Sequence, residues 1–198
     1  MINDSISIDE IHKITLGGSL YDFYIYNFGK GKRKSNGFKK ARNNFMYSLA
    51  GYSLACYVLN IKDRHNQNIL IDAQGHIIHI DYGFILSIAP GKGLNIEQAP
   101  FKMTQEFVDI LGGVSQKKFA EFVNLLKIGF MAIQDHADKV LVLVEMMMMG
   151  QQDLPCFQGE AVMKELKERI FPTKKKMNES EASRFVDELV RQAYGSWR

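Results

Sequence analysis

The sequence predicts an α+β fold that is mostly α-helical, with one β-hairpin near the middle of the chain. Apolar residues recur at spacings of three and four over most of the 198 residues, which is the pattern of amphipathic helices. The short β-branched runs at residues 69–71 and 77–80 break this pattern and predict two paired strands. Apolar residues make up 46% and charged residues 24% of the chain, as in an ordinary globular domain.

The composition excludes several classes of protein. These proportions do not fit a disordered, collagenous or disulfide-scaffold protein. The most apolar stretch, residues 140–149, contains Glu145 and is too short to span a membrane. The first residues lack the basic and apolar regions of a signal peptide. Cys56 and Cys156 fit no metal-ligand spacing, and we expect two reduced thiols of a cytosolic protein.

Three helices are expected before the hairpin. Ser7, with Glu10 three residues later, predicts a capping box at the start of a short helix. Ser19 caps a second helix, which ends at Gly29, and residues 29–37 form a flexible basic loop. The apolar stripe of the long third helix comprises Phe38, Ala41, Phe45, Leu49, Tyr52, Cys56 and Leu59.

The two strands of the hairpin are joined by a turn at residues 72–75. A loop rich in Gly and Pro follows, to about residue 100. The remaining apolar periodicity predicts helices at residues 104–111, 115–134, 135–150, 159–171 and 178–194.

Positive charge is unevenly distributed, although the net charge is only +3. No acidic residue occurs from Phe23 to Lys62, a region that includes the basic segment from Lys30 to Arg42. One-signed patches attract anions such as phosphoinositide headgroups, acidic membranes or nucleic acid. The alternative is that the segment is an ordinary solvated loop.

Two polar clusters flank the hairpin. Asp63, His65 and Asn68 precede the first strand, and Asp81 follows the second. Because a hairpin returns the chain to its start, we expect these clusters to meet in space. Asp63 and His65 are then candidate proton acceptors, and Asn68 and Asp81 supply oxygen ligands of the kind that Mg²⁺ prefers beside nucleotide phosphates. Phosphoryl transfer requires this combination. The alternative is a polar loop with a helix cap, followed by a turn.

The other histidines and the methionine run are expected to be structural. His76 and His79 alternate with isoleucines, and we expect them on the exposed or cross-strand side of the hairpin. His12 and His136 have no visible partner in the sequence. Residues 146–149, four methionines, are expected in the core or on a packing surface.

Residues 63–68 and 81–83 resemble the catalytic loop and metal-binding triplet of the phosphatidylinositol 3- and 4-kinase superfamily. In that superfamily the order is D-R-H-x-x-N and D-F-G. The resemblance is strongest to the type III beta phosphatidylinositol 4-kinases and extends over essentially the whole chain. Tyr82 in place of Phe, and Gln67 in place of a smaller or acidic residue, are mild departures. The segments that carry the closer resemblance are residues 50–54, 62–68, 75–86, 101–109 and 154–159.

The resemblance implies that residues 1–198 form the C-terminal lobe of a protein-kinase-like catalytic domain. It implies a catalytic loop at about residues 60–68 and an activation loop at about residues 79–104. The hairpin would carry both the catalytic and the metal-binding loops. No counterpart of the N-terminal lobe, with its phosphate loop and phosphate-binding lysine, precedes Asp4. We therefore expect the chain alone to be inactive.

The resemblance also implies a role for each candidate residue. Asp63, Arg64 and His65 form the catalytic group, in which Asp63 and His65 act on the inositol hydroxyl. Asn68 and Asp81 bind Mg²⁺ (or Mn²⁺) together with ATP. The implied reaction transfers the γ-phosphate of ATP to the 4-hydroxyl of phosphatidylinositol, in phosphoinositide signalling and membrane traffic.

The implied partners are a membrane and its phosphatidylinositol, with no nucleic acid. The resemblance places such a protein in the cytoplasm, peripherally bound to Golgi-type membranes, where the segment from Lys30 to Arg42 would help it dock. After Tyr82 the expected activation loop has only Lys92 and Lys102 as basic residues, opposed by Glu97. This favours plain phosphatidylinositol, because a headgroup already carrying two phosphates would need a clustered basic pocket. Two alternatives stay open: a Ser/Thr protein kinase of the same superfamily, and a non-catalytic protein that binds membranes or partners.

Overall fold

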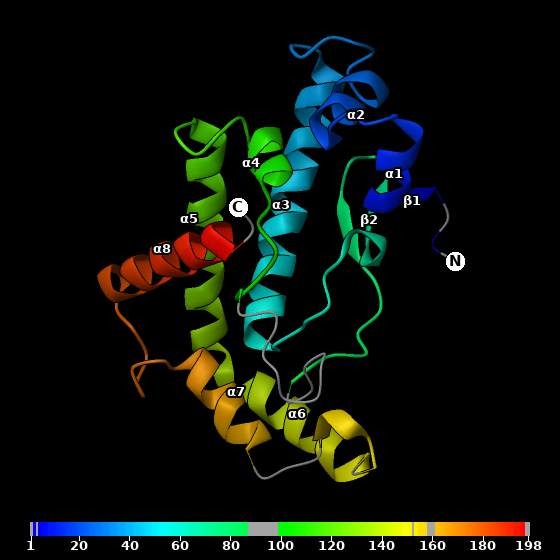
Figure 1. Ribbon diagram of the computed structural model, residues 1–198. Coiled ribbons are helices and arrows are strands. Elements are labelled where there is room, and N and C mark those ends of the chain that lie inside the picture. The colour runs from blue at the N-terminus through cyan, green and yellow to red at the C-terminus, as the bar shows by residue number, and fades with distance from the viewer. Residues whose placement is uncertain (1, 3, 87–98, 152, 158–160, 197–198) are drawn as a thin grey trace.

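The computed structural model describes residues 2, 4–86, 99–151, 153–157 and 161–196. The long helix α3 (Asn36–Val58) stands at the centre of the molecule, with helix α5 (Lys117–Asp135) on one side and a small sheet on the other (Figure 1). The mostly helical α+β class predicted from the sequence is confirmed.

The first two helices begin where the capping signals predict. Ser7 precedes α1 (Ile8–Ile14), and its side chain accepts from the Glu10 backbone while the Glu10 carboxylate accepts from the Ser7 backbone. Ser19 forms the same reciprocal pair with Asp22 at the start of α2 (Leu20–Asn27). These boxes satisfy backbone N–H groups that have no partner within the helix.

The sheet contains the predicted hairpin and one further strand. Strands β2 (Ile69–Asp72) and β3 (Ile77–His79) pair antiparallel, and β1 (Ser5–Ser7) adds to the outer edge of β2 in the order β1-β2-β3. The expectation of a single hairpin therefore missed β1. A strand of three residues is too short to give a periodic pattern, and its capping residue Ser7 marks only the helix that follows.

The remaining predicted helices are confirmed, with ends that shift by a few residues. Single turns of 3₁₀ helix, η1 (Asn66–Asn68) and η2 (Pro155–Phe157), lie at the candidate catalytic loop and after the methionine run. The other helices are α4 (Gln105–Leu111), α6 (Ala137–Gly150), α7 (Val162–Ile170) and α8 (Glu179–Ser196).

Two apolar clusters stabilise this arrangement. The larger surrounds α3 and includes Phe45, Phe107 and Phe130, and the smaller lies between α6 and α7 around Val144 and Leu166. The larger cluster therefore includes residues both before and after the hairpin in sequence, and it holds the chain on both sides of the hairpin. Cys56 and Cys156 are not joined in a disulfide. Among the described residues, no helix has the length and apolar character that crossing a bilayer requires.

The methionine run on α6 only partly meets its expectation. Met148 packs against the smaller cluster, whereas Met146, Met147 and Met149 are exposed. The helical period explains the difference, because Met148 lies one turn after the buried Val144 and its neighbours point away from that face.

Candidate active site

The hairpin brings the two polar clusters together. The Ile80 backbone N–H donates to the Asn68 carbonyl at 3.0 Å, which continues the β2–β3 ladder past the ends of both strands. Asn68 therefore lies opposite Ile80, and Asp81 is the next residue along. Directly opposed residues on antiparallel strands have Cα atoms about 4.5–5.5 Å apart. Asn68 and Asp81 are thus neighbours, as the hairpin predicted.

Arg64 is the buried centre of this region, with only 1% of its surface exposed. Its guanidinium donates to the Lys62 carbonyl at 2.9 Å, to the Ile80 carbonyl at 2.7 Å and to the Asp81 carbonyl. These bonds connect the loop before the hairpin to the residues after it. The structure places Arg64 beneath the site, with its charge directed at the backbone.

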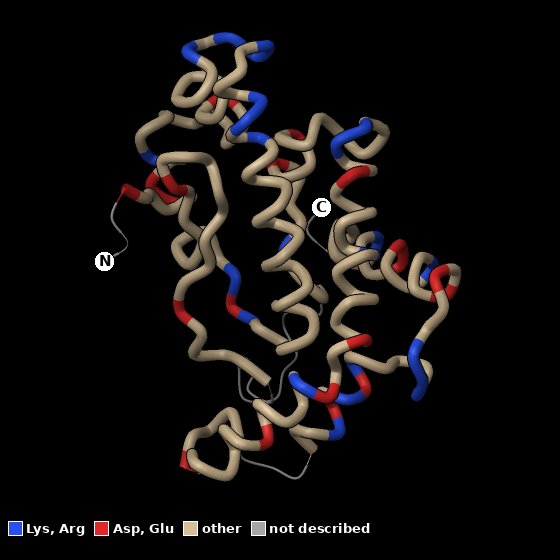
Figure 2. Tube along the Cα trace, turned by 180° about the vertical axis from the view of Figure 1, so that it is seen from behind, with Lys and Arg blue, Asp and Glu red and all other residues tan. Residues whose placement is uncertain are grey.

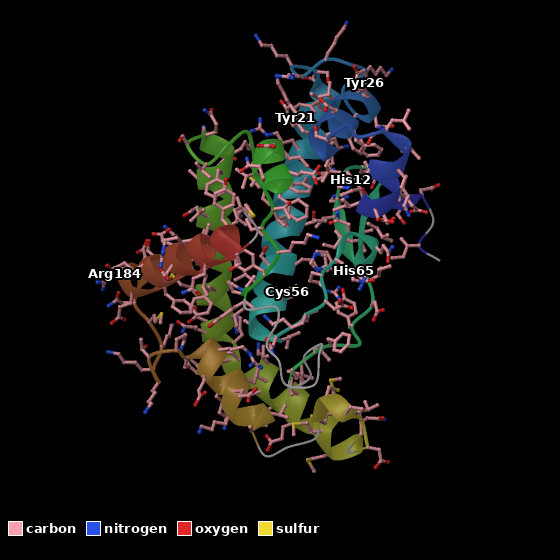
Figure 3. All side chains as sticks on the ribbon, viewed as in Figure 1. His12, Tyr21, Tyr26, Cys56, His65 and Arg184 are labelled. Carbon is pink, nitrogen blue, oxygen red and sulfur yellow. The ribbon has the colours of Figure 1, made fainter. Side chains whose placement is uncertain are left out.

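Asp63 and His65, which flank Arg64, reach the surface. Their side chains are 34% and 47% exposed, and Asp63 Oδ2 lies 3.7 Å from His65 Nε2. Asp63 has a left-handed backbone with φ +64°, a conformation that Asp tolerates better than most residues. Figure 3 labels His65 in this loop. Because the buried Arg64 lies between a partly exposed Asp63 and an exposed His65, a carboxylate and an imidazole both reach solvent.

Asn68 and Asp81 offer oxygen atoms to a cation. Asn68 is buried, and its Nδ2 donates to the Asp63 carbonyl at 3.0 Å, so its Oδ1 is the atom left for a ligand. The exposed Asp81 carboxylate accepts from the Gly83 backbone at 3.1 Å through Oδ1. One amide and one carboxylate oxygen fit Mg²⁺, which takes the rest of its shell from phosphates and water. The described residues contain no group of three or more Asp, Glu, His or Cys side chains that could hold a metal ion by themselves.

His79, which the sequence predicts on the exposed or cross-strand side of the hairpin, lies opposite Ile69 of β2 but is not exposed. It is 5% exposed, its ring stacks on Tyr52 of α3 with centroids 4.4 Å apart, and its Nδ1 lies 3.5 Å from Cys56 Sγ. Burial, with Arg64 and Lys102 nearby, lowers the pKa of His79 to about 3. The expectation of exposure failed because β3 turns its His79 face toward α3, where Tyr52 and Cys56 accept an aromatic ring.

His76 and His12 behave differently from His79. His76, on the exposed side of the hairpin as expected, contacts Asp72 with 2.7 Å between Nδ1 and Oδ2. His12 has a partner that the sequence did not reveal, because its Nε2 lies 3.0 Å from Glu106 Oε1 on α4.

Tyr82, the departure from the D-F-G pattern, finds a partner for its hydroxyl. The hydroxyl donates to the His79 carbonyl at 2.9 Å. Partial burial and the neighbouring Tyr52 raise the pKa of Tyr82 to about 12. The phenol is therefore neutral at physiological pH and contacts the backbone that leads to Asp81.

Lys102 is a residue whose place sequence reasoning missed. The sequence groups it with the basic residues of the expected activation loop, yet it is 4% exposed and contacts the candidate catalytic loop. Its Nζ donates to the Arg64 carbonyl at 2.9 Å and to Asn66 Oδ1 at 2.6 Å. The apolar neighbours Phe101 and Met103 were the available signal, because a lysine between two buried residues is restrained near the core. Lys92 and Glu97, in the same expected loop, lie outside the described residues.

The chain matches one family model over residues 17–158, that of the phosphatidylinositol 3- and 4-kinases. It is 42% identical over 192 residues to the phosphatidylinositol 4-kinase beta of rat, mouse and human. The match covers 96% of this chain and 23% of each relative, so the chain spans about a quarter of the length of these relatives.

Proposed function

Because the chain belongs to the phosphatidylinositol 3- and 4-kinase family, we propose that it is the C-terminal lobe of a phosphatidylinositol 4-kinase catalytic domain. Its residues 60–68 would be the catalytic loop and residues 79–104 the activation loop. The proposed reaction transfers the γ-phosphate of ATP to the 4-hydroxyl of phosphatidylinositol. The observation that supports it most directly is the pairing of Asn68 with Ile80, the residue before Asp81, together with the hydrogen bond from the Asn68 side chain to the Asp63 carbonyl.

Asn68 and Asp81 are the proposed ligands of Mg²⁺ or Mn²⁺. The Asn68 Oδ1 and the Asp81 carboxylate would hold the ion against the phosphates of ATP. When bound, the ion neutralises the charge that develops on the transferred phosphoryl group. The Arg64 bonds to the Ile80 and Asp81 carbonyls keep the Asp81 backbone in place for this contact.

His65 is the proposed base and Asp63 the group that orients it. The oxygen of the 4-hydroxyl forms a bond to the γ-phosphorus as the bond from that phosphorus to the bridging oxygen of ADP breaks. The hydroxyl proton moves to a ring nitrogen of His65. A separation of 3.7 Å between Asp63 and His65 is longer than a hydrogen bond, and such contacts tighten when substrate binds.

The proposed substrate is plain phosphatidylinositol, with no further phosphate on its inositol ring. A phosphorylated headgroup would need a cluster of basic side chains facing it. Lys102, one of two basic residues in the activation-loop sequence after Tyr82, is buried against the catalytic loop instead. This argument supports the 4-kinase branch of the family over kinases that act on phosphorylated lipids.

The basic segment from Lys30 to Arg42 is proposed to contact an anionic membrane, such as that of the Golgi, on the cytoplasmic side. Its lysines are exposed and lie on the loop between α2 and α3 and on the start of α3 (Figure 2). Arg42 is an exception, because its guanidinium donates inward to the Leu111 carbonyl. His79, two residues before Asp81, stacks on Tyr52 of α3, which follows Arg42 by ten residues, or about 15 Å along the helix. The segment would therefore orient the protein and not bind the reacting headgroup.

A chimera tests the proposed activity. The chain replaces the matching segment of rat phosphatidylinositol 4-kinase beta, which supplies an N-terminal lobe, and the chimera is assayed with Mg-ATP. We expect phosphate transfer to vesicles of phosphatidylinositol, with the product carrying its phosphate at the 4-position. Phosphorylation of a Ser/Thr peptide instead would favour a protein kinase. A folded chimera that binds Mg-ATP and modifies neither would favour a non-catalytic protein.

Vesicle sedimentation tests the membrane contact. The variant with Lys30, Lys32 and Lys34 changed to Glu should bind vesicles of phosphatidylcholine and phosphatidylserine more weakly than the unaltered chain. Reversal of the exposed Lys117 on α5 is the matched control. Equal binding by the triple variant and the unaltered chain would contradict the membrane contact and favour the alternative that the segment is an ordinary solvated loop.

A further inference from the structure

We propose that Lys102 is a positioning residue that holds His65 in its reactive place. The inference rests on the proposed function, because it concerns the same reaction. Lys102 is followed by Met103 and Thr104, the N-cap of α4, and it lies 36 positions from Asn66 in sequence. It reaches the candidate active site from beneath, so it would not touch the substrate.

Two hydrogen bonds of Lys102 bracket His65. Its Nζ donates to the carbonyl of Arg64, the residue before His65, and to the side chain of Asn66, the residue after it. A buried ammonium is costly unless it is hydrogen-bonded, so these bonds strongly favour one arrangement of the loop. Any shift of the peptide segments around His65 would have to break one of them.

Lys102 itself is firmly anchored. Its neighbours Phe101 and Met103 are 4% and 0% exposed and belong to the main apolar cluster. The Thr104 side chain accepts from the Phe107 backbone and caps α4. The Lys102 ammonium is thus attached to a rigid part of the core, and its hydrogen bonds restrain the backbone around His65.

The position of His65 depends on the contacts of Lys102, because few other interactions restrain the imidazole ring. Within the described part of the chain, its imidazole has one ion-pair contact, with Asp63 at 3.7 Å, and no side-chain hydrogen bond. Its orientation is therefore governed by its own backbone, which Lys102 restrains on both sides. Asn68 and Asp81 are held separately, by the β2–β3 ladder and by Arg64.

Lys102→Met in the active chimera tests the inference, since it keeps the aliphatic stem and removes the ammonium. We expect kcat for phosphatidylinositol to fall about 10- to 100-fold, because a misplacement near 1 Å can cost that much. The KM for Mg-ATP should stay unchanged, because the Asn68 and Asp81 ligands keep their own supports. A kcat that falls by less than about threefold, or a kcat loss matched by a raised KM for Mg-ATP, would overturn the inference.

Asn66→Ala provides a second variant, which removes one acceptor of Lys102 at a partly exposed position. It should lower kcat without changing the KM for Mg-ATP. The double variant should be no worse than Lys102→Met, because residues that act through one contact are not additive. Independent, additive losses in kcat would contradict a shared role of Lys102 and Asn66.

Lys117→Met, at an exposed lysine of α5, is the matched control and should leave kcat unchanged. If Lys102→Met does not fold, the kcat of Asn66→Ala alone tests the inference, and an unchanged kcat would overturn it.

Amide hydrogen exchange of the 198-residue chain gives a readout that does not need activity. Lys102→Met should speed exchange in peptides covering residues 64–66, while exchange in β2 and β3 stays slow. Unchanged exchange at residues 64–66 would overturn the inference. An inactive unaltered chimera with the expected exchange change would instead refute the proposed reaction and keep the anchoring role of Lys102.

Discussion

Asp81 combines an exposed carboxylate with a left-handed backbone, φ +57°. Asn tolerates this conformation nearly as well as Asp, and its amide oxygen can still accept from the Gly83 backbone. Asp81→Asn in the chimera should therefore fold normally and lose activity, because the charge needed by the metal is gone. Lipid-kinase rate and thermal unfolding, measured together, check this. Activity within about tenfold of the unaltered chimera would rule out Asp81 as a metal ligand.

His65 is the second single residue on which the proposed chemistry depends. A positioned base contributes about 10²–10⁴-fold to the rate, so His65→Ala should lower kcat by that factor. His76→Ala is the matched control, because His76 is also partly exposed but contacts Asp72 at the far end of the hairpin. A loss of less than about threefold for His65→Ala would mean that another group accepts the proton.

At the scale of elements, the hairpin depends on a close approach between its turn and α3. Gly75 has φ +83°, and a Cβ there would lie 2.7 Å from Ala41 Cβ. Gly75→Ala should lower the free energy of unfolding by at least about 1 kcal/mol from backbone strain, with steric repulsion in addition. Denaturant titration measures the change.

Gly51→Ala is the control for that prediction. Gly51 lies within α3, its backbone is not left-handed, and a Cβ added there would meet nothing within 4 Å. Alanine should stabilise the helix there by about 0.5–1 kcal/mol. Equal effects of the two substitutions would show that the hairpin turn does not need glycine.

Acid should loosen the contact between β3 and α3 through His79. The folded-state pKa of about 3 lies below the ordinary value near 6.5, so below pH 6.5 the unfolded chain binds a proton that the folded chain does not. This group therefore makes the free energy of unfolding fall as pH decreases, by about 1.4 kcal/mol per pH unit between 6 and 3. His79→Gln should give a shallower pH dependence than the unaltered chain or His136→Gln. Identical slopes would show that His79 is not buried in the neutral form.

The elements that the sequence predicts well are those with local signals. Ser7 with Glu10 and the turn at residues 72–75 encode their structure within a few positions, and both are confirmed. The meeting of Asn68 with the residues before Asp81 followed from the hairpin alone. β1 was missed because pairing with β2 spans more than sixty residues of sequence.

The side chains that the sequence misplaced are those whose surroundings come from distant segments. His79 is buried because Tyr52 and Cys56 lie across from it on α3. Lys102 is buried because Arg64 and Asn66 provide two acceptors for its ammonium group. A pattern of polar and apolar residues shows which face of a strand is polar, but not which polar side chain will find a buried partner.

For the whole molecule, the decisive question is whether this chain binds nucleotide by itself. The described residues include the proposed metal ligands Asn68 and Asp81, and we identify no phosphate loop or phosphate-binding lysine among the 198 residues. Catalysis of phosphoryl transfer is mostly positioning and charge neutralisation, so two ligands supply only part of the required contacts. We therefore expect calorimetric titration of the 198-residue chain with Mg-ATP to give weak or no binding, while the chimera binds. A micromolar dissociation constant for the chain alone, about −8 kcal/mol, would show that this lobe is a self-sufficient nucleotide site and that no second lobe is needed to bind ATP.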